Sequence, residues 1–163
     1  MLKSILSPAT CAECRLCCVF DSTDIWELPV LSEENVRSVK SICSSVQLAE
    51  KGAEHTFSAP ELKDDELYRC PALTDKGCGL PREEMPFDCR IWPFRMMRDE
   101  NGGVVIAVSQ LCRGLNNKTD NELIEFLCNG LDKTIFSFAK EHPDHVKPLT
   151  DGYRVLVRFE LNR

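Results

Sequence analysis

Apolar residues recur at intervals of three and four within residues 31–52, a spacing that predicts a helix with one buried face. Ser32 is a good N-cap residue at the start of this segment, and Gly52 is a natural stop at its end. The apolar positions are Val36, Val39, Cys43 and Val46. We therefore expect a helical spacer over residues 31–52.

A second helical stripe predicts another helix in the last third of the chain. It is expected to begin at Thr119 or Asp120, both good capping residues, and to end before Pro143. The stripe consists of Leu123, Leu127, Leu131 and Ile135. This pattern predicts one continuous helix that packs its apolar face on a core.

Two further patterns indicate strands. Phe94–Arg98 and Val104–Ser109 flank a turn-forming segment with two glycines, which predicts a hairpin. Tyr153–Leu161 alternates apolar and polar residues, which predicts a half-buried strand. Two helices, a hairpin and a C-terminal strand around a loop-rich middle predict an α+β fold, a small, irregular, cysteine-rich domain stabilised by metal.

Length and charge narrow the class of protein. With 163 residues and 18.5 kDa, the chain suits a single domain over residues 1–163. The 20 basic and 26 acidic side chains leave a net charge of −6, which argues against a nucleic-acid partner. No apolar run approaches the roughly 20 residues of a membrane span, so we do not expect the chain to be embedded in a membrane.

The ten cysteines are too many to be explained by packing alone. The first residues of the chain contain only a short apolar stretch that ends at Pro8, unlike a secretory signal. We therefore expect a cytoplasmic protein with reduced thiols. In that compartment closely spaced cysteines indicate metal binding rather than disulfides.

Four cysteines fall within eight residues, at Cys11, Cys14, Cys17 and Cys18. Repeating the C-x2-C spacing directs three sulfur atoms to one point. Ferredoxins hold three corners of a 4Fe–4S cluster in this way, and three of four zinc ligands can have the same spacing. The motif therefore predicts a metal centre and leaves zinc and iron open.

Cys17 and Cys18 are adjacent, and adjacent side chains point in different directions in regular structure. Both could bind one centre only in an irregular turn, so we expect them to serve two centres or one of them to be a bystander. Cys43 and Cys128 instead lie on the apolar stripes of the predicted helices. We expect both to be core residues rather than ligands.

The remaining candidate ligands lie at turns or beside a basic residue, where thiolates are favoured. They are Cys70, Cys78, Cys89 and Cys112. Several arginines lie near the later cysteines in the sequence, at Arg82, Arg90, Arg95, Arg98 and Arg113. They could offset thiolate charge or bind an anion, but pairing with neighbours such as Glu83, Glu84 and Asp88 is the commoner arrangement.

These spacings, together with Cys89-Arg90-Ile91-Trp92-Pro93, are similar to those of the YkgJ-type cysteine-cluster family, described as zinc- or iron-chelating. The resemblance covers residues 11–113, while residues 114–163, with the C-terminal helix and strand, match nothing known to us. It implies eight metal ligands: Cys11, Cys14, Cys17, Cys18, Cys70, Cys78, Cys89 and Cys112.

We therefore expect a metal-binding protein in which eight cysteines chelate an iron–sulfur cluster, zinc or both, serving a redox reaction or a partner enzyme. The alternative is a structural zinc module that acts as a protein-interaction domain. No nucleotide-binding or hydrolase motif is present, and catalysis stays open. A protein partner and the oligomeric state also stay open.

Overall fold

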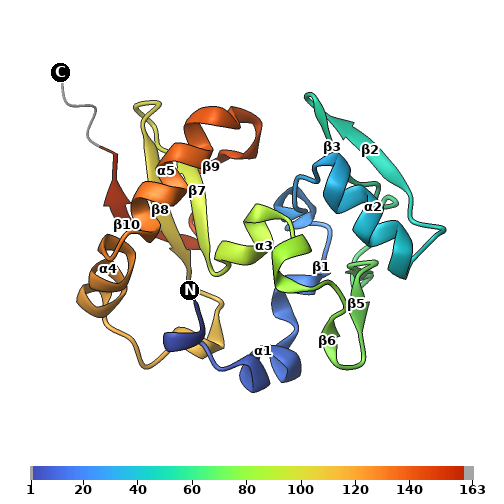
Figure 1. Ribbon diagram of the computed structural model, residues 1–163, viewed down its shortest axis with the longest axis horizontal. Coiled ribbons are helices and arrows are strands. Elements are labelled where there is room, and N and C mark those ends of the chain that lie inside the picture. Colours follow the sequence, from blue (N-terminus) through green and yellow to red (C-terminus); the bar gives the residue numbers. More distant parts are fainter. Residues whose placement is uncertain (1, 160–163) are drawn as a thin grey trace. The chain divides into compact units, whose positions relative to one another are not determined.

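The computed structural model describes residues 2–159, which form two compact units (Figure 1). Unit 1 comprises residues 1–6 and 93–163, and unit 2 comprises residues 7–92. Both contain short helices and small sheets, so the predicted α+β class is confirmed.

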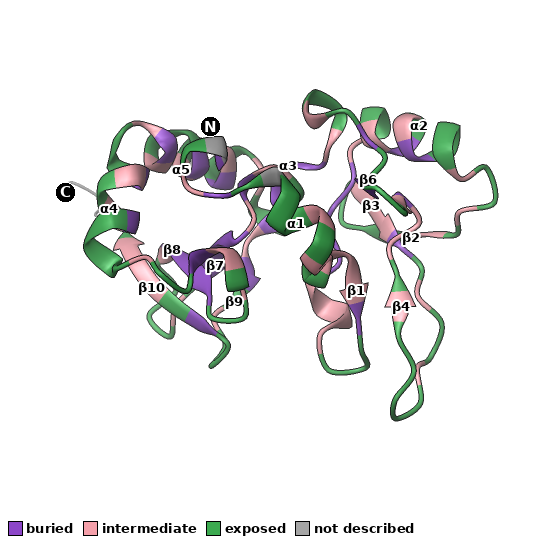
Figure 2. Ribbon diagram, turned by 90° about the horizontal axis from the view of Figure 1, so that it is seen from below, coloured by how far each residue is buried: buried purple, intermediate pink, exposed green. Residues whose placement is uncertain are grey.

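Unit 1 is built on a four-stranded sheet with the strand order β10-β8-β7-β9. The strands are β7 (Phe94–Arg98), β8 (Val104–Ser109), β9 (Lys147–Pro148) and β10 (Tyr153–Arg158). The predicted hairpin is confirmed, and both of its strands begin and end at the predicted residues. Phe94 pairs with Val108 across it. Both strands of this hairpin are buried for most of their length (Figure 2). Met96 and Met97 are therefore core residues, at 1% and 0% exposure.

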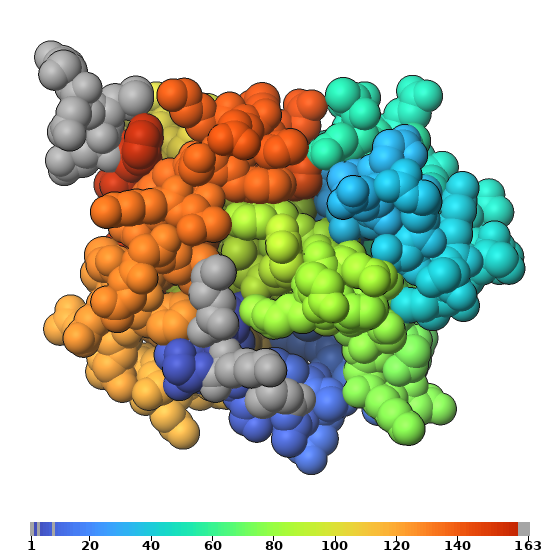
Figure 3. All heavy atoms as spheres, viewed as in Figure 1, coloured from blue at the N-terminus to red at the C-terminus, as the bar shows by residue number. Residues whose placement is uncertain are grey.

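Two helices, α4 (Asp120–Cys128) and α5 (Leu131–Glu141), contact this sheet and lie in front of it in Figures 1 and 3. Thr119 caps α4 in a capping box with Glu122. The predicted stripe is buried as expected, but Gly130, with a φ of 105°, divides the predicted single helix into two. Cys128 becomes the last residue of α4 and is exposed, so its assignment to the core is wrong.

The last strand is shorter than predicted. It ends at Arg158, and its pairing with β8 shifts register between Val155 and Val157. The shift interrupts the alternation, and Phe159 is 46% exposed instead of facing the core. The remainder of the predicted strand lies outside the described residues.

Unit 2 has short elements joined by loops. Its α-helices are α1 (Pro8–Cys14), α2 (Glu33–Ile42) and α3 (Phe87–Ile91). Three two-stranded sheets pair β1 (Val19–Phe20) with β4 (Tyr68–Arg69), β2 (Leu48–Lys51) with β3 (Glu54–Phe57), and β5 (Leu73–Thr74) with β6 (Gly77–Cys78). The 3-10 helices of the chain are η1 (Leu2–Ser4), η2 (Leu16–Cys18), η3 (Ile25–Glu27), η4 (Arg82–Glu84), η5 (Arg113–Leu115) and η6 (Pro143–His145).

The predicted helix over residues 31–52 is correct at its start and wrong beyond Ile42. Ser32 caps α2 in a capping box with Asn35, as its position indicates. Cys43 has an extended backbone at the end of the helix, and Gly52, at a φ of 60°, forms the turn between β2 and β3. Cys43 is half-buried and its Sγ lies 3.7 Å from the Ser45 hydroxyl. It is therefore not the fully buried core residue that the helical pattern predicts.

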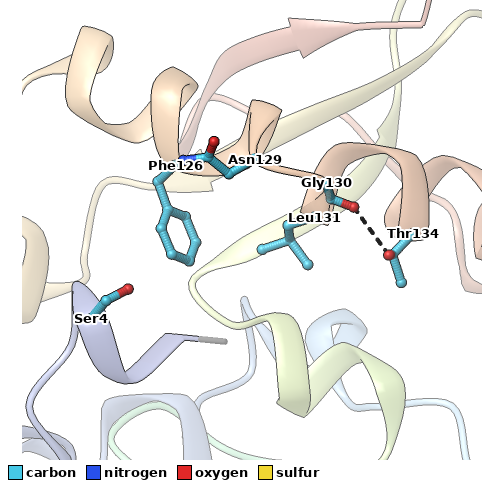
Figure 4. Close-up of a pocket in the computed structure, with 6 residues that line it drawn as sticks. All are labelled: Ser4, Phe126, Asn129, Gly130, Leu131 and Thr134. Carbon is cyan, nitrogen blue, oxygen red and sulfur yellow. Dashed lines mark hydrogen bonds between the residues drawn. The ribbon is translucent and has the colours of Figure 1, made fainter.

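No helix within residues 2–159 is long and apolar enough to cross a membrane. Unit 1 contains a pocket of about 410 Å³ beside the first turn of α5 (Figure 4). Its lining consists of Ser4, Phe126, Asn129, Gly130, Leu131 and Thr134, and the Thr134 hydroxyl donates to the Gly130 carbonyl oxygen at 3.1 Å. None of these side chains titrates or is a strong metal ligand.

Candidate metal centre

Helix α1 carries the first two cysteines on one face. Cys11 and Cys14 are three residues apart, and side chains at this spacing are neighbours on a helix surface. Cys11 is exposed and Cys14 is half-buried. The helix ends at Arg15, which has a left-handed backbone with a φ of 53° and donates its amide to the Cys11 carbonyl oxygen. The chain therefore turns sharply between the first two cysteines and the next two.

Arg15 also joins α1 to the β5–β6 hairpin, which carries Cys78. Its guanidinium donates to the carbonyl oxygen of Ala12 at 2.8 Å and to that of Asp75. Gly77 has a φ of 101°, which other residues rarely adopt, and a Cβ there would lie 3.6 Å from the Ala12 Cα. The glycine lets the hairpin turn against α1, and this contact holds Cys78 beside the helix.

Cys17 and Cys18 lie in the 3-10 turn η2, directly after the left-handed Arg15. Their Sγ atoms are only 3.9 Å apart. This is the irregular turn that would let adjacent cysteines face one centre. The left-handed residue and the tight turn bring both sulfur atoms to one side, while the expectation that the two cysteines serve different centres, or that one is a bystander, stays a prediction.

Strand pairing brings Cys70 to Cys18 across a large sequence separation. Strands β1 and β4 are antiparallel, and the Cys70 amide donates to the Cys18 carbonyl oxygen at 2.9 Å. The amides of Ala72 and Leu73 form hydrogen bonds to the Cys70 thiol, which favour its ionised form. Burial outweighs them and raises the pKa of Cys70 to about 11.

Cys78 and Cys89 complete the set in unit 2, and both are exposed. A hydrogen bond from the Leu80 amide lowers the pKa of Cys78, but burial of the sulfur exceeds this effect and raises it overall. Cys89 lies in α3, where its amide donates to the Pro86 carbonyl oxygen at 3.0 Å. Backbone amides that point at a sulfur are the support that metal-bound thiolates receive in proteins.

The thiols of unit 2 act on one another electrostatically. Burial, and then the charges of Cys17 and Cys14, raise the pKa of Cys11. The hydrogen bond shared with Cys17, burial, and the charges of Cys17, Cys70 and Cys89 raise the pKa of Cys18 far above its ordinary 9.0. Cys17 likewise raises the pKa of both Cys70 and Cys78. Seven thiols therefore lie near enough to oppose one another's ionisation, and a cation among them would reverse the effect.

This donor set fits zinc or iron, because soft thiolates select these metals. A zinc ion bound to sulfur at about 2.3 Å in a tetrahedron separates two ligand sulfurs by about 3.8 Å, close to the Cys17–Cys18 distance. No three cysteine sulfurs of residues 2–159 lie within 4.8 Å of one another. A bound ion would therefore have to draw further sulfurs inward around this pair.

Cys112, the eighth predicted ligand, is half-buried in unit 1, immediately before η5. Cys128 is also in unit 1 and is exposed. Cys43 lies in unit 2 and contributes, after burial and the charge of Cys70, to raising the pKa of Tyr68 to about 12. The structure thus brings seven of the eight predicted ligands together in one unit.

Sequence analysis did not find the amides that support the thiols. The turn Cys70-Pro71-Ala72-Leu73 supplies two of them, and the proline directly after the cysteine was the available signal. It also did not find Arg15 as the joint between α1 and the hairpin, because that role depends on a contact with Asp75, far along the chain.

Comparison of the chain with protein-family models, with curated proteins and with solved structures gives no match in any of the three. The resemblance to the YkgJ-type cysteine-cluster family therefore stays a prediction that rests on the spacing of the cysteines.

Proposed function

We propose that the chain is a metal-binding protein whose cysteine thiolates hold zinc or iron, with zinc the better fit. The observation that carries the proposal is the Cys17–Cys18 pair, whose sulfur atoms lie 3.9 Å apart in a unit that holds five other predicted ligands. That distance suits two ligands of one tetrahedral ion, for which about 3.8 Å is expected. Cys70 and Cys78, with their amide hydrogen bonds, are the best further ligands of this ion.

An iron–sulfur cluster is the second candidate. The C-x2-C-x2-C spacing of Cys11, Cys14 and Cys17 favours it. The charges of Cys14 and Cys17 also raise the pKa of Cys11, which indicates that the three thiols lie near one another. A 4Fe–4S cluster takes one thiolate per iron, so its ligand sulfurs diverge more than a pair on one ion.

The short elements of unit 2 support a structural role for the metal. One buried hydrophobic cluster of unit 2 comprises eight residues: Phe20, Leu28, Leu31, Val36, Val39, Phe57, Ala72 and Leu80. Three two-stranded sheets and short helices provide few backbone ladders to hold the remaining loops. A closed thiolate site would join α1, η2, β4 and β6. The free energy of metal binding would then contribute to the folding stability of unit 2. The resulting module would present its surface to a protein partner.

Elemental analysis and an absorption spectrum of protein purified without oxygen test the proposal. Zinc at one or two ions per chain, with no colour, is expected for the thiolate zinc centre. Iron with equal sulfide and a brown colour would establish the cluster instead. Neither metal, together with all ten thiols free to react with an alkylating reagent, would overturn metal binding.

A further inference from the structure

The two histidines of unit 1 lie next to each other where α5 ends. His142 is the C-cap residue of α5, and its amide donates to the Phe138 carbonyl oxygen at 2.8 Å. His145 is the last residue of η6, and its amide donates to the His142 carbonyl oxygen at 3.1 Å. Pro143 begins η6 directly after the helix. The tight turn therefore brings both imidazoles to the same end of α5.

Both imidazole rings contact Phe138, which lies one turn before His142 on α5. The ring of His142 stacks on that of Phe138, with the ring centres 4.2 Å apart and the planes inclined by 20°. The ring of His145 meets Phe138 edge-on, with the centres 4.9 Å apart. His145 is 3% exposed, whereas His142 is half-buried. The pair is thus held in position by packing, and solvent reaches it at His142.

The two imidazoles are spaced as two ligands of one ion are. Their ring centres are 5.4 Å apart and their planes are inclined by 72°, and a ring nitrogen of His142 lies within 4.8 Å of one of His145. Zinc bound to nitrogen at about 2.0–2.1 Å lies about 3.2 Å from the ring centre, so two imidazoles on one tetrahedral ion have centres about 5.2 Å apart. Rings stacked face to face could not direct two lone pairs at one ion, whereas rings at this inclination can.

The end of α5 is also a favourable place for a cation. The last carbonyl groups of an α-helix give its C-terminal end a partial negative charge. Imidazole nitrogen is a ligand that suits zinc, copper and nickel. Donor chemistry and local electrostatics therefore both favour a divalent transition metal at the His142–His145 pair.

We propose that His142 and His145 form a second metal site, in which two neutral imidazoles bind zinc and oxygen ligands, water among them, complete the coordination. A site with only two imidazole ligands keeps open positions and exchanges its ion more readily than a closed thiolate site. Both residues belong to unit 1 and the site uses no thiol, so the inference goes beyond the proposed function and does not depend on it.

The test titrates zinc into the full chain after its thiols have been loaded with zinc and the excess removed, and calorimetry records further binding. His142→Phe removes a ligand but keeps an aromatic ring against Phe138, and His142→Gln is a second variant. His55→Gln is the matched control, because His55 is the third histidine of the chain and its Nε2 lies 3.0 Å from a carboxylate oxygen of Glu33 in unit 2. We expect one further zinc per chain in wild type and in His55→Gln. The Kd should be at least about tenfold weaker in both His142 variants, which corresponds to about 1.4 kcal/mol.

NMR spectra of the imidazole nitrogens give a readout that packing alone would not produce. Zinc should shift ring-nitrogen resonances of His142 and His145 and leave those of His55 in place. A wild-type chain without further zinc binding, a His142→Phe chain with unchanged affinity, or shifts confined to His55 would overturn the proposal. Cys18→Ser should lose thiolate-bound zinc and keep this site, so failure here and failure of the proposed function are distinguishable.

Discussion

Replacing Cys18 with serine tests whether Cys18 is a ligand of the proposed centre, because this residue contacts both Cys17 and Cys70. The Cys18 sulfur lies 3.9 Å from that of Cys17, and its carbonyl oxygen holds the Cys70 amide at 2.9 Å. Serine has nearly the same shape and preserves the backbone bond to Cys70. Its hydroxyl stays protonated at neutral pH and is a poor ligand for zinc, whereas a thiolate is a strong one. The substitution therefore removes metal affinity while leaving local packing nearly unchanged.

The expected size of the effect follows from linkage between binding and folding. A ligand present at a thousand times its Kd stabilises the folded state by about 4 kcal/mol. For a unit of the size of residues 7–92, 1 kcal/mol shifts Tm by about 4–8 °C. A chelator should therefore lower the Tm of zinc-loaded wild type by about 15–30 °C. Cys18→Ser should begin near that lower value and respond little to the chelator.

The assay is thermal unfolding with and without chelator, combined with zinc content per chain. Cys128→Ser is the matched control, because Cys128 is exposed at the end of α4 in unit 1. It should keep both the zinc and the chelator response of wild type. Full zinc content and an unchanged response in Cys18→Ser would refute the assignment of Cys18 to the centre.

Three other perturbations have expected outcomes. The pKa of Cys70 lies at about 11, above its ordinary 9.0, so this thiol stabilises the chelated, zinc-free protein fully below pH 9 and less as the pH rises to 11. Denaturant titrations should show a loss of at least about 3 kcal/mol over that range, because the raised pKa values of Cys11, Cys18 and Cys78 act in the same direction, and a flat profile would contradict it. Thr119→Ala removes the cap of α4 and should cost about 1 kcal/mol in the same assay, with no loss of zinc. Leu127→Ala empties a fully buried position and should cost about 2–5 kcal/mol, so a cost below 1 kcal/mol would mean that unit 1 is packed differently.

Features that depend on neighbouring residues could be predicted from the sequence. Ser32 and Thr119 cap their helices as expected, because a capping side chain bonds to an amide three residues away. The hairpin over residues 94–109 also follows from local signals, since strand-forming residues flank a turn rich in glycine. The C-x2-C spacing identified the cysteines of interest for the same reason.

Local sequence signals did not predict the backbone conformation where it depends on the tertiary structure. Residues 43–52 fit a helix by periodicity, yet they leave it for a hairpin in which Leu48 pairs with Phe57. Gly130 divides a stripe that is continuous in sequence, because its backbone takes a positive φ. Cys128 consequently ends a helix at the surface.

The sequence by itself determined the α+β class, the helix caps, the hairpin of unit 1 and the set of thiols. Tertiary structure alone decided which thiols meet, because Cys18 reaches Cys70 only through the pairing of β1 with β4. It also decided that Cys17 and Cys18 face one side. Spacing limits what neighbouring residues can bind, whereas the distances between cysteines far apart in the sequence are set by segments that only folding brings together.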